Sequence, residues 1–160
     1  MECGAAMTST ETGLSDEERA LIEAARRAMI HGHAPYSRFA VGAALCLTDG
    51  TILTGSNFEN ASYGLSLCAE TVAIATANAQ GRLRDIALIA VAGRSMGEAD
   101  HSPIVTPCGR CRQIIKEAQD MAGRPLVILC AAAEGTDVMR LSLDALLPHA
   151  FGPAHLGIGS

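Results

Sequence analysis

The sequence predicts an α/β protein of three layers, in which a mixed sheet of about five strands carries helices on both faces. Two observations lead to this prediction. From residue 38 onward, strand-like and helix-like segments alternate, which favours a layered sheet with parallel strands late in the chain. Two strand-like segments, residues 86–92 and 126–131, are continuously apolar, as expected of strands covered on both faces.

The first half of the chain predicts one helix followed by a hairpin. Ser15 and Glu18 have the spacing of a capping box, which begins a helix that runs to about residue 30. Residues 38–47 and 51–57 are predicted to form two strands, because a turn-forming Asp-Gly pair separates them.

The second half supplies two internal helices and the remaining strands. Residues 69–80 and 109–122 are predicted to be helices, and each precedes one of the continuously apolar segments. The tail beyond residue 140 is expected to add one more strand and helix. Neither a repeat nor a linker is evident, so we expect a single domain over residues 15–155, after a disordered lead over residues 1–14.

Composition narrows the classes of partner. The chain carries 12 Lys and Arg against 17 Asp and Glu, a formal net charge of −5, with three Phe and two Tyr. Proteins that grip a phosphate backbone present a basic face, so a nucleic acid polymer is not expected as a ligand. No apolar run is long enough to span a membrane. The first residues lack the pattern of an export signal, which makes the cytoplasm the expected compartment.

Three of the six cysteines differ from the rest in their setting. Cys46 and Cys130 lie inside apolar runs and are expected in the core, and Cys3 lies in the lead. The others stand at the starts of the two internal helices: Cys68, Cys108 and Cys111. Residues i and i+3 share a helix face, so the last two can reach one ion. The positive ends of both helices favour thiolates.

Three thiolates beside an acid predict a catalytic zinc site. No histidine lies near either motif, so a fourth protein ligand is not evident. Catalytic zinc sites leave one position for water, whereas structural sites are closed by four ligands. Glu70, two residues after Cys68, would act as the acid and base. Two other interpretations of the Cys-x-x-Cys motif are a redox pair and a structural zinc site. Glu70 argues against both, because neither has a use for a carboxylate there.

The two motifs together match the signature of the zinc deaminases, with a cysteine in place of the usual histidine. Residues 39–45, 57–64 and 107–113 extend the match, which runs from about residue 15 to residue 151. On these motifs the chain resembles the small homotetrameric cytidine deaminases. The resemblance implies their fold, one zinc ion per chain, and hydrolytic deamination of cytidine and deoxycytidine in pyrimidine salvage. Blasticidin S deaminase has a similar last motif, so a modified cytosine nucleoside is the alternative substrate.

The resemblance also implies a role for each residue of the site. Water activated by zinc attacks C4 of the pyrimidine, while Glu70 takes a proton from the water and delivers it to the ring. Asn57 and Glu59 hold the ribose hydroxyls, Phe39 lies against the base, and the backbone N–H of Ala69 contacts the pyrimidine. The spacing of the ribose pair agrees, since residues i and i+2 of a strand point to one face.

In the resembled family the active sites are shared between subunits of a homotetramer. Ala61, Tyr63 and Phe151 are then expected to reach a neighbour's pocket, although Phe151 can instead cap its own core. Thr71 stands where the family often has Arg, beside a zinc ion whose three thiolates leave a net negative charge. We expect the helix ends and Arg112 to offset that charge. The loop over residues 94–106 is either a lid or an inert insertion.

Overall fold

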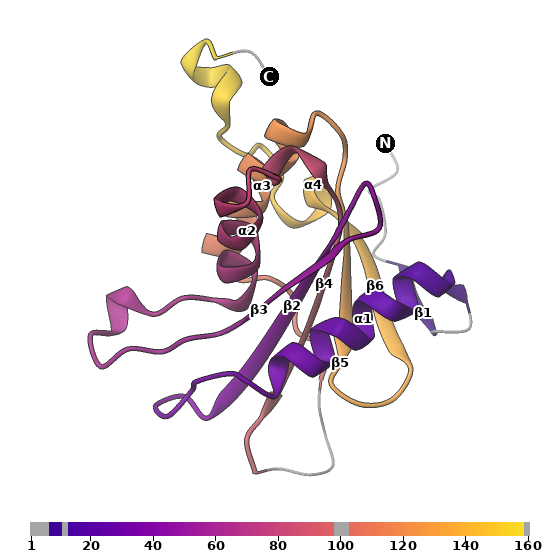
Figure 1. The fold of residues 1–160 in the computed structure, drawn as a ribbon, viewed down its shortest axis with the longest axis vertical. Coiled ribbons are helices and arrows are strands. Elements are labelled where there is room, and N and C mark those ends of the chain that lie inside the picture. Colours follow the sequence, from indigo (N-terminus) through magenta and orange to yellow (C-terminus); the bar gives the residue numbers. More distant parts are fainter. Residues whose placement is uncertain (1–6, 11–12, 98–102, 159–160) are drawn as a thin grey trace.

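The computed structural model describes residues 7–10, 13–97 and 103–158. They form a six-stranded sheet in the order β1-β6-β5-β4-β2-β3, with helices on both faces (Figure 1). The strands are β1 (Met7–Thr10), β2 (Phe39–Leu47), β3 (Ile52–Ser56), β4 (Ile86–Ser95), β5 (Val127–Ala132) and β6 (Asp137–Ser142). The α-helices are α1 (Asp16–Met29), α2 (Ala69–Ala79), α3 (Gly109–Ala122) and α4 (Leu143–Leu146). The predicted three-layer α/β fold is confirmed.

The residues that were expected to start, turn and stop these elements do so in the structure. The Ser15 hydroxyl accepts from the backbone N–H of Glu18, whose carboxylate accepts in turn from the Ser15 N–H, so the capping box is present. The predicted hairpin pairs β2 with β3 in antiparallel register. Gly123 ends α3 in the left-handed conformation, with φ of 65°, which glycine adopts at little cost.

Two expectations about the sheet need correction. Residues 1–14 were expected to be disordered, yet Met7–Thr10 pair with β6 as the sixth strand. This polar segment has no strand pattern, because backbone hydrogen bonds alone can hold an edge strand. β4 and β5 are parallel as expected, but β6 runs antiparallel to β5. The connection between β5 and β6 is too short for the crossover that parallel strands require. Residues 1–6 and 11–12 lie outside the described part.

The two faces of the sheet have separate cores. Along β2, Ala44 and Cys46 belong to the cluster under α1, while Ala43 and Leu45 belong to the larger cluster under α2 and α3. This alternation follows from the period of two in a strand. In Figure 1, α1 crosses one face of the sheet, and α2 lies away from α1, beside α3. None of the described helices is long and apolar enough to cross a membrane.

Glycine allows two helices to approach the sheet at backbone distance. A Cβ atom on Gly42 would lie 2.1 Å from the carbonyl oxygen of Ala25 in α1. A Cβ atom on Gly55 would lie 2.6 Å from the carbonyl oxygen of Ala69 and 2.5 Å from the backbone nitrogen of Ala73. The first turn of α2 is therefore seated directly on the backbone of β3, which sets the position of that helix end.

We expect Gly55→Ala to lower the free energy of unfolding by about 1–3 kcal/mol, the usual cost of overpacking a closely packed site. The added methyl group must displace backbone atoms of α2, and this outweighs the smaller entropic gain of replacing glycine. Urea unfolding of the variant measures the loss. Gly13→Ala is the matched control, because a Cβ atom there meets nothing within 4 Å. Equal stability of the two variants would show that this contact does not set the packing of α2.

Candidate active site

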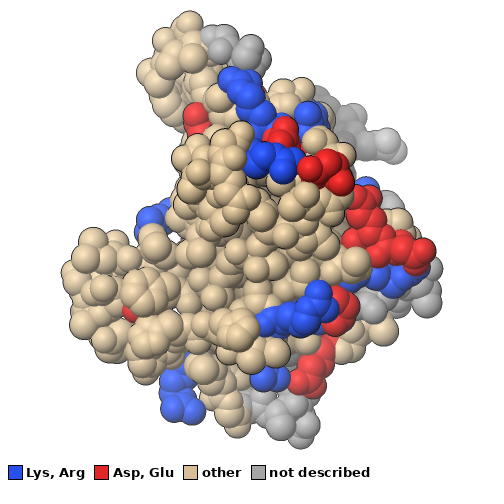
Figure 2. Space-filling view, viewed as in Figure 1, with Lys and Arg blue, Asp and Glu red and all other residues tan. Residues whose placement is uncertain are grey.

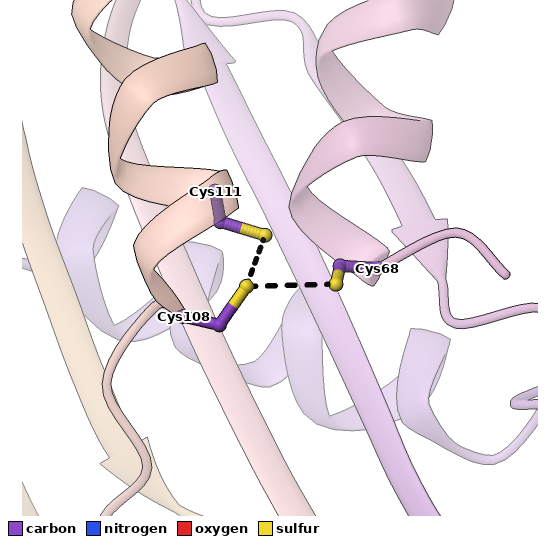
Figure 3. Close-up of side chains that lie close together, drawn as sticks. All are labelled: Cys68, Cys108 and Cys111. Atoms are coloured by element: carbon purple, nitrogen blue, oxygen red, sulfur yellow. Dashed lines mark hydrogen bonds between the residues drawn. The ribbon is translucent and has the colours of Figure 1, made fainter. Parts of the chain in front are cut away.

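Three cysteine sulfurs converge where the first turns of α2 and α3 face each other (Figure 3). Cys68 is the N-cap of α2, Cys108 is the N-cap of α3, and Cys111 lies in the first turn of α3. The Sγ atom of Cys108 is 3.8 Å from that of Cys68 and 3.4 Å from that of Cys111. All three sulfur atoms lie within 4.8 Å of one another. One ion placed between them can contact all three.

The environment of these sulfurs favours thiolates. Neither N-cap thiol forms a capping hydrogen bond, so both are available to a ligand at the positive ends of two helices. A hydrogen bond from Cys111 lowers the pKa of Cys68 to about 6, and the Arg110 guanidinium acts in the same direction. The same hydrogen bond, together with burial, raises the pKa of Cys111. A metal ion would displace the proton that this pair holds.

The donor set fits zinc with an open coordination position. Three thiolates are soft donors that suit Zn²⁺, and the group contains no further Cys, His or carboxylate among the described residues. Glu70 follows Cys68 by two residues in α2 and is only 3% exposed. Burial raises the pKa of this carboxyl group. A buried acid outside the ligand set is available for proton transfer.

A cavity of about 370 Å³ opens beside the sulfurs. Its lining includes Cys68, Cys108 and Glu70, together with the four residues predicted to bind substrate: Phe39, Asn57, Glu59 and Ala69. The structure thus brings β2, the segment after β3 and the start of α2 to one site. A cavity of this size suits a small molecule.

Asn57 and Glu59 are held by the backbone around them. β3 ends at Ser56, so both residues lie beyond the strand on which they were predicted. The side-chain amide of Asn57 continues the ladder: its Oδ1 accepts from the Val41 N–H and its Nδ2 donates to the Phe39 carbonyl, both at 2.9 Å. One Nδ2 hydrogen therefore remains for a ligand.

The carboxylate of Glu59 is fixed through one of its two oxygens. Oε2 accepts from the backbone N–H groups of Tyr36 at 2.9 Å and Ser37 at 3.1 Å. A hydrogen bond from the Ser37 side chain, with these two backbone bonds, lowers the pKa of Glu59. The group is therefore ionised at neutral pH, and Oε1, which takes neither backbone hydrogen bond, can accept from a ligand hydroxyl.

Several cavity residues were not singled out from the sequence. They share an apolar or small polar character and sit on strands or loops: Val41, Val91, Val105, Thr106, Ser66 and Leu67. A signal existed for Val41, which is two residues after Phe39 and so points to the same face of β2. Gly93 is opposite Val41 in β4, where a Cβ atom would lie 3.0 Å from both Phe39 and Val105.

The remaining predicted residues lie outside this lining. Ala61 and Tyr63 are in the exposed segment before α2, and Phe151 lines a different groove beside α3. Thr71 Oγ1 is buried and has no hydrogen-bond partner among the described residues. The Arg112 guanidinium reaches oxygens, not sulfurs: it donates to Pro107 O and Leu146 O, each at 2.8 Å, and to Thr106 Oγ1. Five residues of the 94–106 loop, 98–102, fall outside the described part.

A three-thiolate metal site with an open position, a buried carboxylate and a small cavity define a zinc-dependent enzyme for a small molecule. The family model of the cytidine and deoxycytidylate deaminase zinc-binding region matches residues 15–123. The chain belongs to this family.

Relatives and solved structures agree with this assignment. A cytidine deaminase of Halalkalibacterium halodurans is 40% identical over 135 residues, which cover 84% of this chain and 94% of the relative. One from Mycobacterium tuberculosis is 41% identical over 128 residues, covering 80% of this chain and 84% of the relative. The crystal structure of cytidine deaminase from Burkholderia pseudomallei superposes with a TM-score of 0.72 at 41% identity, covering 86% of this chain and all (100%) of that one.

We expect Cys108→Ala to lose most of its zinc, because only two thiolates would remain to hold the ion. Elemental analysis of the purified protein should give about one zinc per chain before the substitution and little after it. Cys46→Ala is the control, since that buried cysteine lies in the cluster under α1, on the other face of the sheet. Equal zinc content in Cys108→Ala and wild type would exclude Cys108 as a ligand.

Proposed function

We propose that the protein hydrolyses cytidine and deoxycytidine to uridine and deoxyuridine with release of ammonia. The observation that carries this proposal is the buried Glu70 beside three converging thiols, at a cavity of nucleoside size. Membership of the deaminase family supports it, as do relatives that are themselves cytidine deaminases. The same relatives disfavour the alternative of a blasticidin S deaminase.

Glu70 supplies the proton transfers of the reaction. A bound zinc ion would supply Lewis-acid activation of the attacking water. The Glu70 carboxylate takes a proton from that water, passes it to N3 of the ring, and later helps to protonate the departing amine. Its burial matters twice, because a dry site strengthens its hydrogen bonds and because the raised pKa makes it a better base.

The other cavity residues orient the nucleoside. Oε1 of Glu59 and the remaining Nδ2 hydrogen of Asn57 are placed to hold sugar hydroxyls, since their other polar atoms are already occupied. The Phe39 ring supplies an apolar face for the base, and the N–H of Ala69, at the positive end of α2, would donate to the pyrimidine. Correct placement of the ring lowers the barrier to attack.

We also propose a homotetramer with shared sites. Between residues 60 and 81 the only charged residue is Glu70, which is buried. This stretch includes α2 and the exposed side chains of Tyr63 and Leu65. Figure 2 shows that most charged side chains of that face lie away from this region. A large uncharged surface of this kind favours association, in which Ala61, Tyr63 and Phe151 would complete a neighbour's pocket.

We also propose a cellular location and the bounds of the domain. The zinc-binding thiols must stay reduced, which favours the cytoplasm and a role in pyrimidine salvage. Residues 15–155 form the single deaminase domain. Beside Thr71, the positive ends of α2 and α3 offset the negative charge of the metal centre. The Arg112 guanidinium, bound to the carbonyls of Pro107 and Leu146, contributes to that offset.

We expect Glu70→Gln to keep its zinc and to lose at least 10²–10⁴-fold in kcat, the usual contribution of general acid–base catalysis. The amide has nearly the shape of the acid but cannot carry the proton. Zinc analysis and the decrease in ultraviolet absorbance of cytidine measure the two properties on one sample. Near-normal turnover in Glu70→Gln would exclude the proposed mechanism.

We expect cytidine and deoxycytidine to be good substrates, and cytosine and cytidine monophosphate to be poor ones. Cytosine lacks the sugar contacts that position the ring. The monophosphate would place its charge near ionised Glu59, and none of the described residues that line the cavity is Lys or Arg to neutralise it. Comparison of kcat/KM for these compounds and blasticidin S tests this order. A preference for the monophosphate or for blasticidin S would contradict it.

The same assay tests the ribose assignment separately. Glu59→Gln should reduce kcat/KM for cytidine by about 10- to 100-fold, the worth of a hydrogen bond to a charged group, while zinc content stays unchanged. Unchanged cytidine kinetics would remove Glu59 from the sugar site and leave the deaminase assignment standing.

A further inference from the structure

The C-terminal segment, from the last residue of α4 at 146 to residue 151, is hydrogen-bonded to α3 by two consecutive side chains of that helix. Directly after the zinc-site Cys111, the Arg112 guanidinium donates to the carbonyl of Leu146 at 2.8 Å. The next side chain, Gln113, donates from Nε2 to the carbonyl of Phe151 at 2.9 Å. The beginning and the end of the segment are therefore both bound to the helix that carries two of the three cysteines.

Two backbone features show that this segment is seated closely. A Cβ atom on Gly152 would lie 2.6 Å from Oδ2 of Asp120 and 3.1 Å from Nζ of Lys116, so the backbone there lies against the ends of two side chains from the second half of α3. His149 adopts φ of 56°, a left-handed conformation that is costly for a residue other than glycine. Such a conformation persists where surrounding contacts determine it.

The ring of Phe151 is held at the surface and away from its own cavity. It is 56% exposed and stacks on His155, with ring centroids 5.1 Å apart. It lines a groove of about 760 Å³ between α3 and the C-terminal segment, and not the cavity that contains Glu70. In Figure 1 the chain beyond this point extends away from the sheet. If Phe151 contacts substrate, the substrate must therefore be in another subunit.

We propose that Gln113 is a positioning residue for Phe151. This inference rests on the proposed function, in which Phe151 completes a neighbour's pocket. The amide of Gln113 fixes the backbone of Phe151 on α3, so the ring is presented at a set distance from the cysteines of its own subunit. Gln113 acts through Phe151 and touches neither zinc nor the nucleoside of its own site.

The test is a double-mutant cycle on the zinc-loaded assembly. Gln113→Glu keeps the side-chain shape but places an acceptor oxygen against the Phe151 carbonyl, which breaks the bond. We expect KM for cytidine to rise about 3- to 10-fold, the worth of a neutral hydrogen bond, with kcat and zinc content near wild type. Because Gln113 acts through Phe151, the double variant Gln113→Glu/Phe151→Ala should have the KM of Phe151→Ala alone.

Gly152→Val places a side chain against those of Asp120 and Lys116, which should shift the backbone beside Phe151 and also raise KM. Thr136→Glu, which adds the same charge at an exposed residue of the connection between β5 and β6, is the control for the added charge. Wild-type KM in Gln113→Glu, or effects of Gln113→Glu and Phe151→Ala that multiply, would overturn the proposal. The Phe151→Ala single variant reports on the proposed function alone: an unchanged KM there refutes the shared pocket, whatever Gln113→Glu does.

Discussion

The first turns of α2 and α3 must meet within sulfur-to-sulfur distance, and the rest of the site depends on this constraint. Two helix N-termini repel one another, since each carries a partial positive charge and unpaired N–H groups. Packing has to hold the two helix ends together until the negative charge of the thiolates, bound to a metal ion, offsets this repulsion. On the α2 side the contact of Gly55 with the first turn provides this packing, and on the α3 side Arg112 ties the turn before Cys108 to the end of α4.

The same arrangement explains how one short helix turn can carry two opposite chemistries. Cys68 caps α2 at the edge of the cavity, where a hydrogen bond and a nearby guanidinium lower its pKa. Glu70 is two residues further, under the sheet-facing side, where burial raises its pKa. The thiol is thus prepared to lose its proton to a metal, and the carboxylate is prepared to accept one from water. Environment, and not residue type alone, assigns these roles.

Local signals allowed much of this to be predicted from the sequence. The capping box at Ser15, the Asp-Gly turn and the continuously apolar runs gave α1, the hairpin, β4 and β5, and the paired cysteine motifs gave the metal site. Other features depend on contacts between distant segments. The strand β1 is held by backbone pairing with β6, and the amide of Asn57 completes a ladder with β2, so neither has a periodic pattern to detect.

The position of Gln113 shows why motif spacing alone could not assign every residue. In the sequence it ends the motif over residues 107–113, and the motif alone assigned it no role. In the structure α3 turns the side chain at 113 away from the sulfurs, toward the carbonyl of Phe151. A helix advances about 100° per residue, so neighbours in a motif serve different faces. Cys111 therefore faces the sulfur of Cys108, while Arg112 and Gln113 bind the carbonyls of Leu146 and Phe151. One helix thus fixes both the candidate metal centre and the ring proposed for the adjacent subunit.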